Sequence, residues 1–352
     1  MAIENYGVWV AKAVRVSAER AQDDPESPHI HLFYEDGSGG EFDGARRASI
    51  NVKSLSAISE LVYWIVRDFA HPVVNELREL GTGFHELANA PGGAALDYIR
   101  GNLMDFTTGR LLPHDQPGEQ DDIIDFVMPE LQTAINRKAT VYLFGEPYTD
   151  LQGIHNIHMN QGSAARFARF NGIWQDGAVI LHFPEEDRFD AIFMAFASQA
   201  VHTDEGSGDA LQGSQNFAQL LGRAPSGEGE PGETQIADDL RVAIVGALVN
   251  PVGPENQPQS TGRSESVYLL NRTTEELSLN GWSIPNRADA PQQIGATNVL
   301  APGEVRTIAV PDAPLSNGGG LISLLDEDGN KVDGVSYSRD QARHEGEIVI
   351  FR

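Results

Sequence analysis

Short apolar and alternating runs dominate the first part of the chain. The stretch YGVWVAKAVRV (6–16) has the mixed pattern of a strand, and HIHLFY (29–34) alternates with the period of two that places His29 and His31 on one face. A third strand, ARRASINVKS (45–54), follows a glycine-containing turn. These runs predict a small antiparallel sheet or barrel at the start of the chain.

A more helical region is expected next. Residues 56–69 are apolar at roughly helical spacing, although LVYWIV within them could be a buried strand. Asp121 or Asp122 is expected to cap a helix that runs to about Lys138, because acids cluster in its first turn and bases in its last. TVYLFG (140–145) is then a buried strand. This order of elements predicts an α+β fold for residues 1–205.

The pattern changes in the last third of the chain. Residues 206–239 are acidic and rich in glycine, which predicts a linker with too few apolar residues to form a core. From Leu240 onward, about seven short strands alternate with Gly, Pro and Asn turns, and no helix is needed. This spacing predicts an all-β immunoglobulin-like sandwich over residues 240–352.

Composition narrows the possible functions. The 352 residues carry 51 acids against 25 bases, a net charge of −26, so bulk electrostatic binding of nucleic acid is not expected. A small phosphate-bearing substrate remains compatible with this charge. The absence of cysteine excludes disulfides, thiolate nucleophiles and cysteine zinc sites. The sequence shows no signal peptide and no apolar run of about 18 residues, which predicts a cytoplasmic protein without a membrane span.

Candidate chemistry is concentrated in residues 153–184. His155 and His158 are the predicted catalytic residues, because an imidazole that titrates near neutral pH can act as a nucleophile or a general base. Asp176, in an expected hairpin turn at Gln175-Asp176-Gly177, would orient a histidine. The predicted substrate-binding residues, which offer amide, hydroxyl or imidazole groups, are Asn160, Gln161, Ser163, Gln175 and His182.

Each of these groups also has a structural interpretation. The polar residues around His158 could be a hydrogen-bonded turn that satisfies buried backbone groups, and His182 could be a core histidine. His29 and His31 could join the site if their strand lies alongside it, or they could face water. A divalent metal ion held by His155, His158, His182 and an aspartate is a further hypothesis.

Two resemblances extend this interpretation. The chain resembles the YukJ-like family of uncharacterised bacterial proteins in the motifs NYGVWVAKAV, NVKS, ALDYIRGN, GIHNIHMNQG, NGIWQDGAVILHFP and FMAFASQAVHTD. The C-terminal region resembles a lamin tail domain in VYLLNRTTEELSLNGWSI, LAPGE and GGLISLLDEDGNKVDGVSY. The first resemblance implies an architecture but does not indicate an activity. The second implies a sandwich that binds or positions a partner.

Two functions from different classes follow. The first is a hydrolase of the phosphodiesterase or nuclease type that uses a pocket lined by His, Asn and Gln side chains. The second is a non-catalytic binding or assembly protein in which the lamin-tail-like sandwich docks a protein partner through an exposed strand edge.

Overall fold

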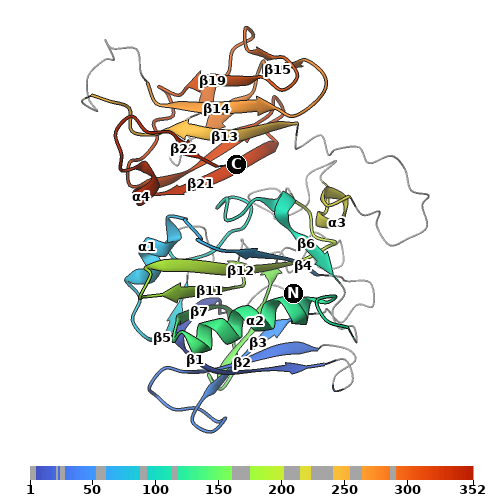
Figure 1. Cartoon of the computed structure of the whole chain (residues 1–352), viewed down its shortest axis with the longest axis vertical. Helices are drawn as coiled ribbons and strands as arrows, with labels where there is room; N and C mark the ends of the chain where they lie inside the picture. Colours follow the sequence, from blue (N-terminus) through green and yellow to red (C-terminus); the bar gives the residue numbers. More distant parts are fainter. Residues whose placement is uncertain are drawn as a thin grey trace, which may run out of the picture. The chain divides into compact units, whose positions relative to one another are not determined.

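The computed structural model describes residues 5–20, 23, 28–52, 61–87, 93–112, 118–160, 175–201, 215–222, 241–253, 264–285 and 291–351. The chain divides into two compact units (Figure 1). Unit 1 comprises Met1–Phe69, Val73–Arg100 and Phe106–Gly232, and unit 2 comprises Ala70–Pro72, Gly101–Asp105 and Glu233–Arg352. Within the described ranges, no helix has the length and apolar character needed to cross a membrane. The predicted boundaries at 205 and 239 lie outside the described residues.

Unit 1 is built on a closed barrel of five strands. In barrel order these are β1 (Gly7–Glu19), β2 (His29–Glu35), β3 (Arg46–Asn51), β8 (Gly153–Ile157) and β7 (Thr140–Pro147), and β7 pairs back with β1. Strands β3 and β8 are parallel, and the other barrel pairs are antiparallel. The first part of β1, from Gly7 to Lys12, pairs with β7, and the part from Lys12 to Glu19 pairs with β2. The β1–β2 ladder contains a register shift between Ala13 and Arg15.

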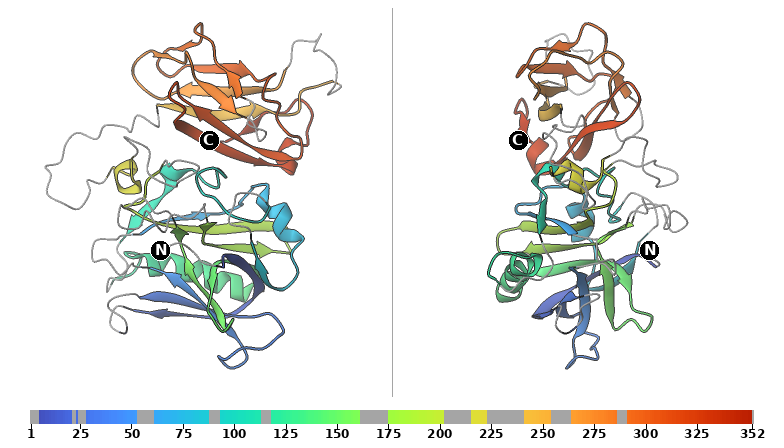
Figure 2. Two further views of the ribbon diagram at one scale, coloured as in Figure 1. Left: turned by 180° about the vertical axis from the view of Figure 1, so that it is seen from behind. Right: turned by 90° about the vertical axis from the view of Figure 1, so that its right-hand side faces the viewer.

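Alternating apolar side chains fill the barrel. Ile30, Leu32 and Tyr34 of β2 point into one core together with residues of β1, β3, β7 and β8. Helix α2 (Ile123–Asn136) packs on β1 and contributes its own apolar face to this core; Figure 2, right, shows it nearly end-on beside the strands. The Asp122 side chain accepts a hydrogen bond from the backbone N–H of Asp125, which confirms the predicted helix start.

The sheet continues beyond the barrel, and this extension contradicts the predicted α+β fold. Strand β7 also pairs with β11 (Ala178–Phe183), followed by β12 (Arg188–Phe196), β4 (Leu61–Val66) and β6 (Arg110–Leu112), while β5 (Gly83–Glu86) pairs with β1. Of the residues that the structure describes, 45% lie in strands and only 12% in helices, and the N-terminal part holds the closed five-stranded barrel. LVYWIV is the strand β4, which confirms the strand alternative and not the helix for these six residues. Periodicity cannot distinguish the two, because the run is apolar throughout.

The predicted turn at Gln175-Asp176-Gly177 is also wrong. Gln175–Asp176 forms β10, which pairs with β9 (Met159–Asn160), and the chain continues directly into β11. Gly177 serves a close backbone approach, since a Cβ at this position would lie 2.5 Å from the backbone nitrogen of His158. The remaining elements of this unit are short: α1 (Val73–Arg78), η1 (Phe106–Thr108) and α3 (Phe217–Leu220).

Unit 2 contains two four-stranded antiparallel sheets, seen as two layers in Figure 2. Their orders are β19-β14-β13-β22 and β17-β16-β20-β21, and β15 and β18 form a separate pair. A single core that includes the buried Trp282 lies between the sheets. The elements are β13 (Val242–Leu248), β14 (Ser266–Asn271), β15 (Leu277–Ser278), β16 (Ser283–Pro285), β17 (Pro291–Gln293), β18 (Val299–Leu300), β19 (Val305–Ala309), β20 (Gly319–Leu325), β21 (Lys331–Ser338), α4 (Arg339–Ala342) and β22 (Val349–Ile350). The lamin-tail resemblance itself stays a prediction.

Candidate functional site

Asp176 lies inside unit 1 and has no exposed surface. The backbone N–H of Tyr98 donates to its carboxylate at 2.5 Å, and the Tyr6 hydroxyl donates to its carbonyl oxygen at 2.9 Å. The Tyr98 hydroxyl also donates to the carbonyl of Gly177. These contacts connect the segment around Tyr98 to β10. The Asp176 carboxylate therefore has a structural role and is not accessible to a substrate from solvent.

His158 and His182 have separate surroundings. His158 is only 8% exposed, and its ring centroid lies 4.7 Å from that of Phe196. The His182 ring stacks on Phe189 at 4.2 Å, and its Nε2 lies 3.4 Å from Asp187 Oδ1. Burial lowers the pKa of His182, against the opposing effect of Asp187.

The predicted metal set is therefore not assembled. Within the described part of the chain, neither of the two metal-sized clusters of His, Asp and Glu atoms contains His155, His158 or His182. Asn160 and Gln175 face each other as backbone partners in the β9–β10 ladder. Gln161 and Ser163 lie outside the described residues.

His155 occupies a different environment on the outer side of β8. Its ring stacks on Tyr148 with centroids 4.6 Å apart, and its Nε2 lies 3.9 Å from Glu146 Oε2. Glu146 is held in turn by Asn156, whose Nδ2 donates to Oε2 at 2.6 Å. Burial lowers the pKa of His155 below its ordinary value, although Glu146 and Asn156 oppose the shift. His155 thus combines a neutral imidazole with a neighbouring carboxylate, an arrangement suited to a general base.

Tyr148 connects His155 to the strands of the early sheet. Its hydroxyl lies 2.8 Å from Ser49 Oγ on β3, and Arg47 Nη2 donates to the same hydroxyl at 3.4 Å. Ser49 is the cross-strand partner of His31 on β2. Strand β2 therefore lies alongside the predicted site, and its histidines share an outer surface with His155.

The outer residues of β1, β2 and β3 form three cross-strand rows: Glu19–His29–Asn51, Ser17–His31–Ser49 and Arg15–Phe33–Arg47. Burial, the positive charge of Arg47 and His29 together lower the pKa of His31 to about 4, so its imidazole is neutral at pH 7. We call the whole surface the histidine face. It consists of Glu19, His29, His31, Phe33, Arg47, Ser49, Asn51, Glu146, Tyr148 and His155.

The sequence indicated only part of the histidine face. The alternation in HIHLFY correctly placed His29 and His31 on one side of a strand. Arg47, Glu146 and Tyr148 were missed, because they come from β3, the end of β7 and the turn after it, and none of them belongs to a local motif. The order of strands around the barrel brings them together.

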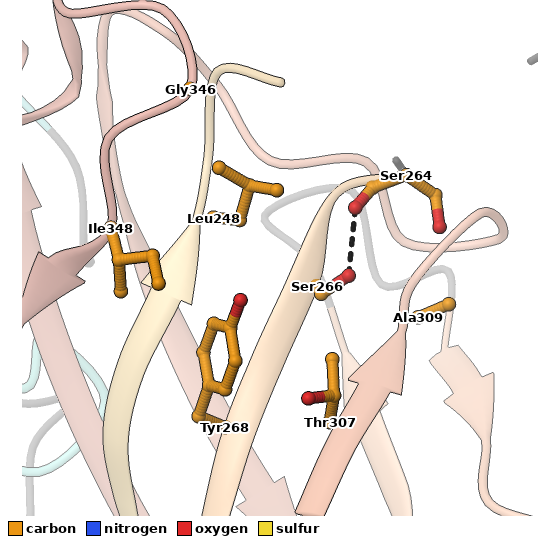
Figure 3. A pocket seen from close by; sticks show the side chains of 8 residues that line it. All are labelled: Leu248, Ser264, Ser266, Tyr268, Thr307, Ala309, Gly346 and Ile348. Carbon is orange, nitrogen blue, oxygen red and sulfur yellow. Dashed lines mark hydrogen bonds between the residues drawn. The ribbon is translucent and has the colours of Figure 1, made fainter. Parts of the chain in front are cut away.

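A hollow lies on the outer face of one sheet of unit 2 (Figure 3). It has a volume of about 440 Å³ and lies over two neighbouring cross-strand rows. One row consists of Gly246, Tyr268 and Thr307, and the next of Leu248, Ser266 and Ala309. Small residues on both sides of Tyr268 leave this space open. The lining residues, which are all uncharged, are Leu248, Ser264, Ser266, Tyr268, Thr307, Ala309, Gly346 and Ile348.

Known proteins are similar to this chain over the part that carries the histidine face. Residues 1–208 match a family model described as "Uncharacterized conserved protein (DUF2278)". The chain is also 35% identical over 219 residues to "Uncharacterized protein YukJ" of Bacillus subtilis (strain 168), a match that covers 58% of this chain and 93% of that protein. The family match covers more than half of the chain. The protein therefore belongs to the DUF2278 family of uncharacterised conserved proteins, as its YukJ-like motifs predicted.

Proposed function

We propose that unit 1 binds a phosphate-bearing ligand on the histidine face, with Arg47 as the residue that holds the anion. The proposal rests on the environment of the Arg47 guanidinium. This side chain is half-buried, yet no carboxylate of the described residues lies within 4.0 Å of it, and its buried Nε has no hydrogen-bond partner among them. A partly buried cation without a counter-charge is costly, and binding an anion would offset that cost.

The preceding residue provides a contrast. Arg46 lies 3.3 Å from Asp36 and also donates to the Leu151 carbonyl, so its charge is already neutralised. Arg47 instead lies over the rings of Phe42 and Tyr148, at 5.1 and 5.5 Å. In a chain with 51 acids and 25 bases, an arginine that contacts rings in place of carboxylates is available to a ligand. Arginine is suited to phosphate, because its planar guanidinium can donate two parallel hydrogen bonds.

Hydrolysis of a phosphoester is the catalytic form of this proposal. His155, held beside Glu146, would take a proton from water while the water oxygen forms a new bond to phosphorus. The phosphorus–oxygen bond to the leaving alcohol would break, and the imidazolium would give its proton to that oxygen. His158 and Asp176 have no role in this form, because both are buried. Five-stranded barrels of the oligonucleotide- and oligosaccharide-binding type also bind ligands on strands 2 and 3, which supports the location by analogy of fold alone.

The binding step is tested with inorganic phosphate and bis(4-nitrophenyl) phosphate as probes, titrated into the full-length protein by calorimetry. Arg47→Gln is expected to weaken binding about 10-fold or more, as loss of a charge-assisted hydrogen bond would. The matched control is Arg67→Gln, which removes the same charge from a side chain that is 70% exposed. Equal affinity of the Arg47→Gln variant and the wild type, or no binding by the wild type, overturns the proposal.

The catalytic step is tested separately with the same diester. His155→Gln is expected to retain binding and lose release of 4-nitrophenol. If the wild type binds the diester without cleaving it, the hydrolase form is rejected and the binding form remains.

Docking of a protein partner through unit 2 is the second candidate function. The observation that favours it is the uncharged hollow around Tyr268, on a sheet face that also exposes Val305, Ile348 and Ile350. Apolar surface interrupted by a few hydroxyl groups suits an uncharged peptide segment. The hollow would accept its side chains, and the hydroxyls of Tyr268 and Thr307 would bond its backbone.

Blocking the hollow tests this candidate. Thr307→Arg would place a long charged side chain across the hollow, whereas Thr297→Arg makes the same change at an exposed position outside its lining. A partner crosslinked in cells to a photoreactive residue at position 348 should be lost in the first variant and kept in the second. Equal crosslinking in both variants rejects the hollow as the docking site.

A further inference from the structure

Glu19, His29 and His31 surround a common point at the ends of β1 and β2. Glu19 Oε2 lies 3.6 Å from His29 Nδ1 and 3.5 Å from His31 Nε2, and the three ligand atoms all lie within 4.8 Å of one another. Both distances exceed the range of about 2.7–3.2 Å for a good N–H···O hydrogen bond. The three atoms therefore surround a space and are not bonded tightly to each other.

We propose that Glu19, His29 and His31 bind a divalent transition-metal ion of the zinc type. In a tetrahedral site with metal–ligand bonds of about 2.0–2.1 Å, neighbouring ligand atoms are about 3.4 Å apart, close to the separations from Glu19 to the two histidines. Two imidazoles and one carboxylate are a donor set that zinc prefers. Three protein ligands also leave one tetrahedral position for water or a substrate.

The scaffold holds this trio in place. Glu19 and His29 are direct cross-strand partners, and His31 lies two residues further along the same face of β2. The two histidine rings are stacked at 6.0 Å with their planes only 20° apart. The side chains of Glu19, His29 and His31 are 33%, 20% and 14% exposed, so an ion can reach them from solvent. Ligands on paired strands need little rearrangement when a metal binds.

A second observation comes from β3. Asn51 is the cross-strand partner of His29 on the other side of β2, and its side chain is only 9% exposed. Its buried Oδ1 has no hydrogen-bond partner among the described residues. A buried amide oxygen normally has such a partner. Water brought by a metal ion at the neighbouring His29 is a donor of the kind that this oxygen lacks among the described residues.

The other metal-sized cluster of the described residues, Asp121, Asp122 and Asp125, is explained without an ion. Asp122 accepts the backbone N–H of Asp125 as the cap of α2. Arg20 lies 3.6 Å from Asp122 and 3.8 Å from Asp125, so a cation is already present. The Glu19–His29–His31 trio is the cluster that a metal ion would complete.

Metal binding by the trio does not depend on the proposed phosphate site, and it is tested with metal alone. The full-length protein is treated with a chelator and titrated with Zn²⁺ by calorimetry and with Co²⁺ by visible absorption. One equivalent of each ion is expected, with the intense absorption of tetrahedral Co²⁺. Glu19→Gln, His29→Gln and His31→Gln should each weaken binding at least about 10-fold.

His155→Gln and His182→Gln are the matched controls, because each removes a partly buried histidine beside a carboxylate, and both should bind metal as the wild type does. NMR of the wild type provides a measurement without substitution: substoichiometric Co²⁺ should shift the ring signals of His29 and His31 first. A wild type that binds neither ion, or a His29→Gln/His31→Gln double variant that binds both unchanged, overturns the proposal.

Discussion

At the scale of the residue, Asp176 holds two segments of unit 1 together. Its carboxylate accepts the backbone N–H of Tyr98, and its carbonyl oxygen accepts the Tyr6 hydroxyl. The Tyr6 hydroxyl in turn accepts the backbone N–H of Leu96 at 3.1 Å. Burial raises the pKa of Tyr6 and of Tyr98 far above their ordinary values, so both remain neutral donors. A residue with a sequence context that suggests catalysis can therefore be part of the core.

Asp176→Ala is expected to lower the free energy of unfolding by about 3 kcal/mol, because it leaves the Tyr98 N–H buried without an acceptor. Asp176→Asn keeps an acceptor oxygen and should cost less. Urea denaturation measures both values. The affinity of the folded Asp176→Asn variant for phosphate should equal that of the wild type. A large loss of affinity in a stably folded Asp176→Asn protein would instead show that Asp176 contributes to binding.

His71 predicts a pH dependence of stability. It is 6% exposed and its Nε2 donates to the carbonyl of Gly101 at 2.7 Å, while burial lowers its pKa to about 4. The unfolded chain, with an ordinary pKa of about 6.5, binds the proton first as pH falls. Stability from this residue is therefore complete above about pH 6.5, and it declines by about 1.4 kcal/mol per pH unit between about pH 6.5 and the folded-state pKa of about 4.

Urea denaturation between pH 7.5 and pH 5 measures this dependence. His71→Gln should show a smaller loss of stability over the same range, although it starts from a lower value. His85→Gln is the control, because His85 is not buried. An unchanged pH slope in His71→Gln would contradict the assignment.

At the scale of the element, strand β8 can enter the barrel because its neighbours approach closely. A Cβ at Gly153 would lie 1.8 Å from the carbonyl oxygen of Arg47 on β3, and a Cβ at Gly145 would lie 2.3 Å from that of His155. Neither glycine has a positive φ, so each is needed for space and not for backbone freedom. These contacts set the parallel β3–β8 pairing that brings His155 to the histidine face.

Gly153→Ala is expected to separate β3 from β8 and to destabilise unit 1 by about 2–3 kcal/mol or more, because the added methyl group would meet backbone. Gly81→Ala is the matched control, since a Cβ there meets nothing within 4 Å. Thermal denaturation compares the two variants. Hydrogen exchange should be faster at the β3–β8 ladder in Gly153→Ala, and equal stability of both variants would contradict this account of barrel closure.

At the scale of the whole molecule, unit 2 includes a short segment from the first third of the chain. Gly101–Asp105 belongs to this unit, and the amide of Asn102 donates to the carbonyls of Ile322 and Val335, each at 3.1 Å. Gly334 leaves the necessary space, because a Cβ there would lie 2.2 Å from Asn102 Oδ1. Unit 2 is therefore not a continuous stretch of sequence.

Asn102→Gly is expected to lower the stability of unit 2 by about 2 kcal/mol, because two buried carbonyls lose their donor. Glycine accepts the φ of 50° at this position, so the change isolates the amide. Asn5→Gly, at a φ of 54° and an exposed position, is the control. Faster hydrogen exchange in β20 and β21 of the first variant alone would support the assignment, and identical exchange in both would refute it.

The sequence alone determined what local chemistry controls. The Asp122 cap and the acids of the first turn located the start of α2, and the alternation in β2 placed its histidines on one face. The family motifs predicted a YukJ-like chain, which the match of residues 1–208 to the DUF2278 family confirms. These features depend on backbone capping, on the two-residue period of a strand and on short motifs.

Tertiary structure decided which of these elements are neighbours. Strand periodicity fixes the face on which a side chain lies but not the strand beside it, so the meeting of His31, Ser49 and Tyr148 required the closed barrel. Long-range contacts with Tyr6 and Tyr98 bury Asp176, and on the barrel Arg47 has no carboxylate of the described residues nearby. The candidate site therefore lies on a barrel face and not in the loop motif that the sequence predicted, because burial and long-range pairing depend on the whole fold.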